Sequence, residues 1–230
     1  MRLSRVAAAM LAVLALGVAG STTGCTRLVD GAAQANGSKP GSEITGDGWG
    51  IQIGYPDAPA RIEFFTEPQC PACAHLQHES GDAIAAAVGQ GRLAVIYRPL
   101  TFLDQGITEY SAHVANAMFL AAGPNTTGTA FQAFVQDLWG HQEPEGSPGP
   151  TDDALSAMAS ESGVGAEETD KIATGKQAID SDQLNEANAE LLSETQYEVS
   201  TPAIYDLVGE EVVDISDPDW LAKLLATPRS

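Results

Sequence analysis

The feature that most constrains the fold is a pair of cysteines at the junction between a strand-like and a helix-like segment. Residues 60–67, ARIEFFTE, form an apolar, β-prone run that predicts a buried strand. Cys70 and Cys73 follow, and apolar residues then recur at helical spacing until GQG ends the pattern at residues 89–91. Residues 92–100, RLAVIYRPL, predict a second strand. The chain therefore runs strand–helix–strand across the cysteines, as expected of an α/β protein.

Two cysteines at this spacing suit three kinds of site. As a structural staple, a disulfide that closes a four-residue loop contributes only about 1.8 kcal/mol, and so short a ring is readily reduced. A tetrahedral zinc site needs four ligands, and His75 and His78 do not complete one with Cys73, so we expect no metal and keep a metallochaperone as an alternative.

Redox exchange fits the position of the cysteine pair best. A cysteine at a helix N-terminus faces unpaired N–H groups and the positive end of the helix dipole, which stabilise a thiolate. Pro71 suits the first helical turn because it has no N–H to lose. Cys70 is then the exposed nucleophile, and Cys73, one turn along, resolves a mixed disulfide.

The rest of the folded region predicts helices followed by two strands. We expect the domain to span residues 49–230, with a short edge strand at WGIQIG (49–54) and a helical insertion at about 104–195. Within that insertion one helix starts near Asp152 and further helix lies between Glu167 and Leu192. Residues 201–215, TPAIYDLVGEEVVDI, predict two short strands joined by a turn at Gly209, and a last helix lies around Trp220.

These elements resemble those of DsbA-like thioredoxin-fold oxidoreductases. PDAPARIEFFTEPQCPAC is similar to the opening of that family, where a strand leads into Cys-Pro-x-Cys, and the helical block occupies the place of the family's inserted helical domain. STPAIYDLVGEEV looks like the family's cis-proline strand and hairpin. The resemblance implies a thioredoxin-like fold, thiol–disulfide exchange at Cys70 and Cys73, and a cis Thr201–Pro202 that offers backbone to a substrate.

Three charged residues near the predicted site are also interpreted from the sequence. Glu63 is a candidate proton relay for Cys73, although TEPQC is one residue longer than the common family spacing between this acid and the first cysteine. Glu67 is interpreted as a solvated turn residue, and Arg98 as the partner of a surface acid.

The N-terminus predicts export. Arg2 and Arg5 precede the apolar run 6–19 and a small-residue segment, so residues 1–24 are interpreted as a signal peptide. TTGC ending at Cys25 resembles a bacterial lipobox, which predicts lipid attachment at Cys25 and a flexible tether over residues 25–48. Cleavage near residue 19 or 20 would instead give a soluble secreted or periplasmic protein.

Composition narrows the class of partner. The formal charge of −20 over 230 residues argues against nucleic acid, because phosphate binding needs basic patches. We expect an extracytoplasmic thiol–disulfide oxidoreductase without a cofactor, which acts on exported protein thiols and disulfides and is served by a membrane redox partner. The alternative is a thioredoxin-fold binding or chaperone module that is redox-inactive.

Overall fold

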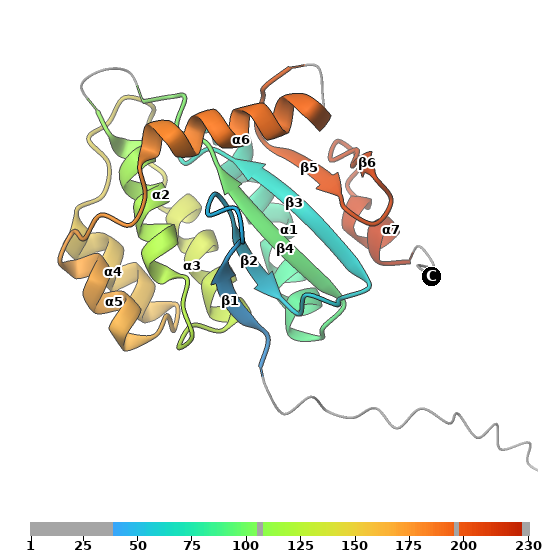
Figure 1. Cartoon of the computed structure of the whole chain (residues 1–230), viewed down its shortest axis with the longest axis horizontal. Coiled ribbons are helices and arrows are strands. Elements are labelled where there is room, and N and C mark those ends of the chain that lie inside the picture. Colours follow the sequence, from blue (N-terminus) through green and yellow to red (C-terminus); the bar gives the residue numbers. More distant parts are fainter. Residues whose placement is uncertain (1–38, 105–107, 196–197, 227–230) are drawn as a thin grey trace, which may run out of the picture. The chain divides into compact units, whose positions relative to one another are not determined.

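The strand–helix–strand unit lies at the centre of a six-stranded sheet. The computed structural model describes residues 39–104, 108–195 and 198–226, and its strand order is β1-β2-β4-β3-β5-β6 (Figure 1). β3 (Ala60–Thr66) and β4 (Leu93–Pro99) pair in parallel and are joined by α1 (Pro71–Gly89). Every other neighbouring pair is antiparallel.

The remaining strands and helices surround this unit. The outer strands are β1 (Gly41–Ile44), β2 (Ile51–Gly54), β5 (Ala203–Asp206) and β6 (Glu211–Val212). The helices between β4 and β5 are α2 (Tyr110–Ala121), α3 (Gly128–Gly140), α4 (Asp152–Glu161), α5 (Ala166–Ala173) and α6 (Ser181–Thr195). α7 (Trp220–Ala226) follows β6.

The central strands are buried on both faces because helices cover each side of the sheet. In Figure 1, α1 lies behind β3 and β4 while α6 crosses in front of them. Phe64 belongs to the large core on the α1 side, and its neighbour Phe65 packs with Leu100 and Leu192 on the α6 side. The continuous apolar run of β3 is therefore explained by burial of successive residues on opposite faces.

A buried polar cluster joins the helical block to the sheet. Tyr97 of β4 donates a hydrogen bond from its hydroxyl to Gln132 of α3, and Gln132 donates to Gln77 Oε1 of α1 at 3.0 Å. All three side chains are almost fully buried. Because buried polar groups need partners, this cluster fixes how α3 packs against α1, which carries the cysteines.

Two predictions about the first strands are wrong. The predicted tether of residues 25–48 extends too far, because β1 begins at Gly41, and β2 is consequently an inner strand rather than an edge. GSEI lacks apolar alternation, and its burial comes from distant partners such as the Thr126 carbonyl, to which Ser42 Oγ donates at 2.9 Å. The further helix predicted between Glu167 and Leu192 is confirmed and consists of two helices, which are separated where Gly175 adopts φ +59°.

Candidate active site

Cys70 occupies the N-cap of α1. Its backbone is extended, with φ −73° and ψ 116°, and Pro71 takes the first helical position. The Cys70 carbonyl accepts hydrogen bonds from the amides of Cys73 at 3.0 Å and Ala74 at 3.2 Å. Both cysteines are free thiols; Cys70 is half-buried, whereas Cys73 is fully buried. A partner sulfur can therefore approach Cys70 but not Cys73.

The two thiols differ in acidity for physical reasons. A hydrogen bond from Cys73 lowers the pKa of Cys70 to about 5 against the opposing effect of burial, helped by the Thr201 side chain and by the amides of Cys73 and Ala72. Burial raises the pKa of Cys73, and its hydrogen bond to Cys70 and the charge on that thiolate raise it further. At neutral pH Cys70 is therefore the thiolate and Cys73 the proton donor.

The loop before β5 completes the site. The Thr201–Pro202 peptide bond is cis, and Cys70 Sγ lies 3.3 Å from the Thr201 carbonyl oxygen, to which Cys70 donates a hydrogen bond only when it is protonated. β5 starts at the next residue, Ala203, and pairs with Phe65 of β3. The antiparallel pairing of β5 with β3 thus brings Thr201 to a cysteine that lies 131 residues earlier in the chain.

Glu67 lies beneath this site and is not the solvated turn residue that the sequence predicts. Its side chain is 0% exposed, and it accepts hydrogen bonds from Ser111 Oγ and, at 2.6 Å, from the Gln69 amide. Burial raises its pKa to about 7 although both hydrogen bonds oppose the shift, and the charges of Asp104 and Cys70 raise it further. Glu67 is the buried acid in electrostatic contact with the reactive thiol.

The loop after α3 holds the cysteine-bearing segment from the outside. Gln142 Nε2 donates to the carbonyls of Pro68 at 2.8 Å and Cys70 at 3.0 Å. The Gly146 amide donates to Gln69 Oε1 at 2.9 Å. We call residues 141–151 the strap, because their contacts restrain the three residues that lead into α1.

Comparison with known proteins places this architecture in a family. Residues 47–226 match the thioredoxin family, which is most of the chain. The chain belongs to the thioredoxin family. The predicted α/β class with a thioredoxin-like fold and helical insertion is confirmed.

Solved structures share the fold of this thioredoxin-family protein. MdbA, a thiol-disulfide oxidoreductase from Corynebacterium matruchotii, superimposes with a TM-score of 0.67 at 19% identity, covering 81% of this chain and 92% of MdbA. Reduced DsbA from Mycobacterium tuberculosis gives a TM-score of 0.60 at 21% identity, covering 77% of this chain and 91% of DsbA. The predicted likeness to DsbA-type folds is thereby confirmed.

A curated relative matches in sequence. The serine/threonine-protein kinase PknE of Mycobacterium tuberculosis is 32% identical over 182 residues, which are 76% of this chain and 31% of PknE. The chain thus spans about a third of the length of the curated relatives it matches.

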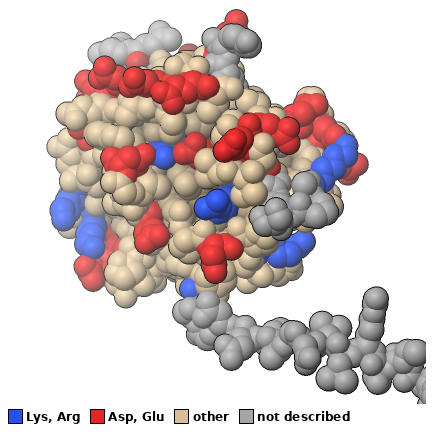
Figure 2. Space-filling view, turned by 45° about the vertical axis from the view of Figure 1, so that its right-hand side comes forward, with Lys and Arg blue, Asp and Glu red and all other residues tan. Residues whose placement is uncertain are grey.

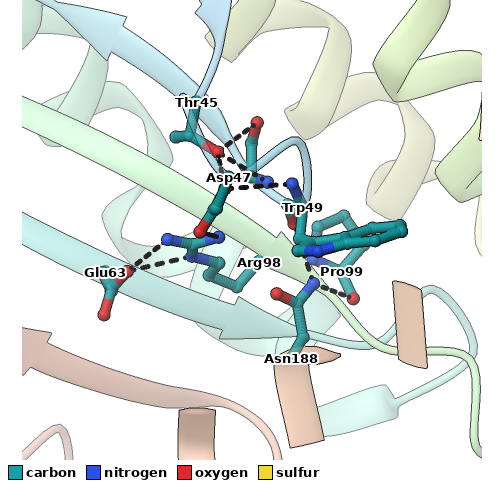
Figure 3. Close-up of polar contacts among 8 residues, drawn as sticks. Thr45, Asp47, Trp49, Glu63, Arg98, Pro99 and Asn188 are labelled. Atoms are coloured by element: carbon teal, nitrogen blue, oxygen red, sulfur yellow. Dashed lines mark hydrogen bonds and ion pairs between the residues drawn. The ribbon is translucent and has the colours of Figure 1, made fainter. Parts of the chain in front are cut away.

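Glu63 and Arg98 form a second polar cluster, in the sheet of this thioredoxin-family protein (Figure 3). Arg98 is 5% exposed and binds Glu63 Oε1 at 2.8 Å and Asp47 Oδ2 at 2.7 Å. The prediction that Arg98 pairs with a surface acid is confirmed by the exposed Asp47, and Arg98 has a second, buried partner in Glu63. The structure holds Glu63 in this ion pair, and Glu67 is the acid whose titration Cys70 perturbs.

Other predicted features can be located briefly. Cys25, the predicted signal peptide and most of the predicted tether lie outside the described residues. Within residues 39–104, 108–195 and 198–226, no helix has the length and apolar character to cross a membrane. The same residues contain no group of three or more His, Cys, Asp and Glu side chains arranged to hold a metal ion.

Proposed function

We propose that this protein is an exported thiol–disulfide oxidoreductase that works through the Cys70–Cys73 pair. The observation that carries the proposal is the half-buried Cys70 at the tip of α1, with its pKa lowered by the buried Cys73 and its sulfur against Thr201. An exposed, acidic thiol with a protonated partner one turn away is suited to exchange rather than to stapling the chain.

The exchange proceeds in two displacements. A substrate thiolate attacks Cys70 Sγ of the oxidised protein, the Cys70–Cys73 bond breaks, and Cys73 leaves and takes up a proton. The second thiolate of the substrate then attacks the substrate sulfur that is bonded to Cys70. A substrate disulfide forms, and Cys70 leaves as a thiolate. The substrate loses two electrons, which the Cys70–Cys73 pair gains. In the reverse direction, Cys73 attacks Cys70 and releases a reduced substrate.

Glu67 supports the transfer of the Cys73 proton. With a pKa of about 7 it can give up or accept a proton near neutral pH, and it lies in a buried network that excludes bulk water. We therefore assign the proton-relay role to Glu67 in preference to Glu63, which is neutralised by Arg98.

The stabilised Cys70 thiolate favours disulfide donation. A low pKa stabilises the reduced protein, which makes the couple more oxidising, and it makes Cys70 a good leaving group, which speeds the release of the disulfide to the substrate. We propose that the substrates are thiols of exported proteins, that Thr201 and Pro202 offer them backbone, and that a membrane redox partner restores the disulfide. The lipidated Cys25 would hold the domain at the extracytoplasmic face of the membrane.

Trapping of mixed disulfides tests this function. Cys73→Ser removes the resolving thiol, so reductant-sensitive, high-mass bands should appear on non-reducing gels of the exported fraction. Cys70→Ser should give none, because the buried Cys73 cannot be reached. If neither variant traps a partner and the wild type neither oxidises nor reduces a model dithiol, the redox-inactive binding module is the better description.

A further inference from the structure

A second carboxylate lies close to the buried acid of the active site. Asp104 follows β4 as Glu67 follows β3, and these two parallel strands pair directly, so both acids lie at the same edge of the sheet (Figure 1). Asp104 is half-buried and lines a cavity of about 820 Å³. Within the part of the chain that the structure describes, no Lys, Arg or His forms an ion pair with Asp104. Its negative charge is therefore not neutralised by a described cation.

The start of α2 holds the Asp104 carboxylate in place. Asp104 Oδ1 accepts a hydrogen bond from the Ser111 amide at 2.8 Å, and Oδ2 accepts one from the Ala112 amide at 2.8 Å. Glu109, the N-cap residue, gives the helix no side-chain cap. Asp104 thus caps α2 from outside the helix, at the end where the helix dipole suits a negative charge.

Two buried side chains bridge Asp104 to Glu67. Gln69 Nε2 donates hydrogen bonds to Asp104 Oδ1 and to Ser111 Oγ, each at 3.0 Å. Ser111 Oγ in turn donates to Glu67 Oε1. The orientation of the Gln69 amide is fixed, because its Oε1 accepts from the Gly146 amide at 2.9 Å. Gln69 and Ser111 are both 0% exposed, so water does not screen the bridge.

Asp104 and Ser111 act on Glu67 in opposite directions. Burial raises the pKa of Glu67 most, and the hydrogen bonds from Ser111 and from the Gln69 amide lower it. The charge of Asp104 raises the pKa of Glu67, as does the charge of Cys70. A residue that holds the bridge therefore also supplies a charge that opposes ionisation of Glu67.

We propose that Asp104 is a positioning residue for the exchange at Cys70 and Cys73, because it orders the bridge to Glu67 and favours the protonated form of that acid. The inference rests on the proposed function, in which Glu67 exchanges a proton with Cys73. Tyr110 of α2 also faces Glu67, but burial raises the pKa of Tyr110 above 10, so its hydroxyl is uncharged near pH 7. The helical insertion thereby acts on the proton transfer through the start of α2.

Titration of the Glu67 carboxyl tests the proposal. The chemical shift of the carboxyl carbon is followed by NMR in the reduced full chain and assigned through its loss in Glu67→Gln. The midpoint should be about 7 in the wild type. Asp104→Asn removes the charge but keeps an acceptor for α2, and it should lower the midpoint by at least about half a pH unit. Ser111→Ala removes a hydrogen bond to the charged form and should raise the midpoint, whereas a general loosening that admits water would lower both midpoints.

Asp182→Asn is the matched control. Acidic side chains gather on much of the face shown in Figure 2, so a general effect of charge has to be separated from that of Asp104. Asp182 lines the same cavity but takes no part in the bridge, so its substitution should leave the Glu67 midpoint unchanged. Asp104→Ser gives a second neutral variant. A midpoint that does not fall in the Asp104 variants, that falls in Ser111→Ala, or that falls equally in Asp182→Asn would overturn the proposal.

A kinetic measurement separates this inference from the proposed function. In chains that carry Cys25→Ser, Cys70 attacks dithiobis(nitrobenzoate) and releases one coloured thionitrobenzoate. Cys73 then loses its proton, attacks Cys70 Sγ and releases the second. The rate of the second release should rise with pH through the Glu67 midpoint, and Asp104→Asn should move this rise to lower pH by the same interval. A rise that stays in place while the carboxyl midpoint falls would overturn the positioning role. If the wild type never releases the second thiolate, the proposed exchange fails, and the carboxyl titration still decides whether Asp104 acts on Glu67.

Discussion

Cys70 and Cys73 differ in acidity because one of them supplies a hydrogen bond that the other receives. The low pKa of Cys70 comes mainly from its hydrogen bond with Cys73, and the helix amides of Ala72 and Cys73 contribute less. The acidity of Cys70 is thus a property of the pair.

Substitution of Cys73 tests this dependence. Cys73→Ser keeps a donor, so thiolate absorbance should still titrate well below the value of about 8.5 for a free cysteine. Cys73→Ala removes the donor and should raise the midpoint of Cys70 by at least about one unit, worth roughly 1.4 kcal/mol. Both variants are best made with Cys25 also replaced, so that one thiol titrates. Identical midpoints in the Ser and Ala variants would assign the effect to the helix instead.

Glu67 makes the stability of the reduced protein depend on pH. Its pKa is raised from 4.5 to about 7 in the folded state. The contribution of protonated Glu67 to the free energy of unfolding is therefore fully present below pH 4.5 and is lost as the pH rises through 7. Glu67→Gln avoids burying the charge. The unfolding free energy of the variant should therefore rise relative to that of the wild type as the pH rises from 4.5 to 7. The difference should reach at most about 3 kcal/mol at pH 8.

Urea unfolding of the two reduced proteins from pH 4.5 to pH 8 measures this difference. The exposed Glu145→Gln is the control and should show no such trend. If the difference in unfolding free energy between Glu67→Gln and the wild type stays constant with pH, Glu67 has the same pKa in the folded and unfolded chain.

The sequence predicts residues whose role depends on their neighbours in the chain. It misses residues whose role depends on contacts with residues far away in the sequence. Cys70 is recognisable because Pro71 and the helical pattern follow it directly, and Pro202 because it opens a strand. Glu67 precedes a proline in a segment that looks like a turn, and its burial depends on Ser111, which lies 44 residues later on α2. No local sequence pattern predicts that contact.

At the scale of elements, the strap is the contact that the helical insertion makes with the cysteine segment. Gln142→Ala removes donors from the Pro68 and Cys70 carbonyls and should cost about 1–2 kcal/mol of unfolding free energy. It should also speed hydrogen exchange at the amides of Cys73 and Ala74, which share the Cys70 carbonyl with Gln142.

Gln136 supplies the matched control for the strap. It lies on α3, a short distance before Gln142, and its side-chain amide donates one exposed hydrogen bond, to Asp82. Gln136→Ala should leave both the unfolding free energy and these amides nearly unchanged. Unaltered exchange in Gln142→Ala would mean that the strap does not restrain the start of α1.

Element boundaries were predictable where a helix or strand has its own apolar periodicity. The strand–helix–strand unit and the last helix have it, and the structure places them close to the predicted residues. β1 escapes prediction because four residues with one buried side chain, Ser42, carry no periodic signal. Its identity as a strand comes from pairing with β2 and from the Thr126 carbonyl.

At the scale of the whole molecule, the proposed lipid attachment at Cys25 would decide where the protein works. Cys25→Ala should release the protein from the membrane fraction or block its processing, because the residue that would carry the lipid is removed. Fractionation and intact mass of the mature chain measure this. Lipidation would be excluded if Cys25→Ala stays in the membrane fraction and its mass differs from that of the wild type only by the substitution. Cys70→Ala, which leaves the N-terminus intact, is the control.

The contact between Cys70 and Thr201 spans 131 residues, so the site is completed late in the life of the chain. At a synthesis rate of about 5–20 residues per second, roughly 7 to 26 seconds separate the two residues at the ribosome. Contacts of such long range also form slowly during folding. Until β5 pairs with β3, both thiols are open to any oxidant that they meet. If the pair works as proposed, each new molecule of this protein is therefore open to thiol oxidation before it can catalyse thiol oxidation.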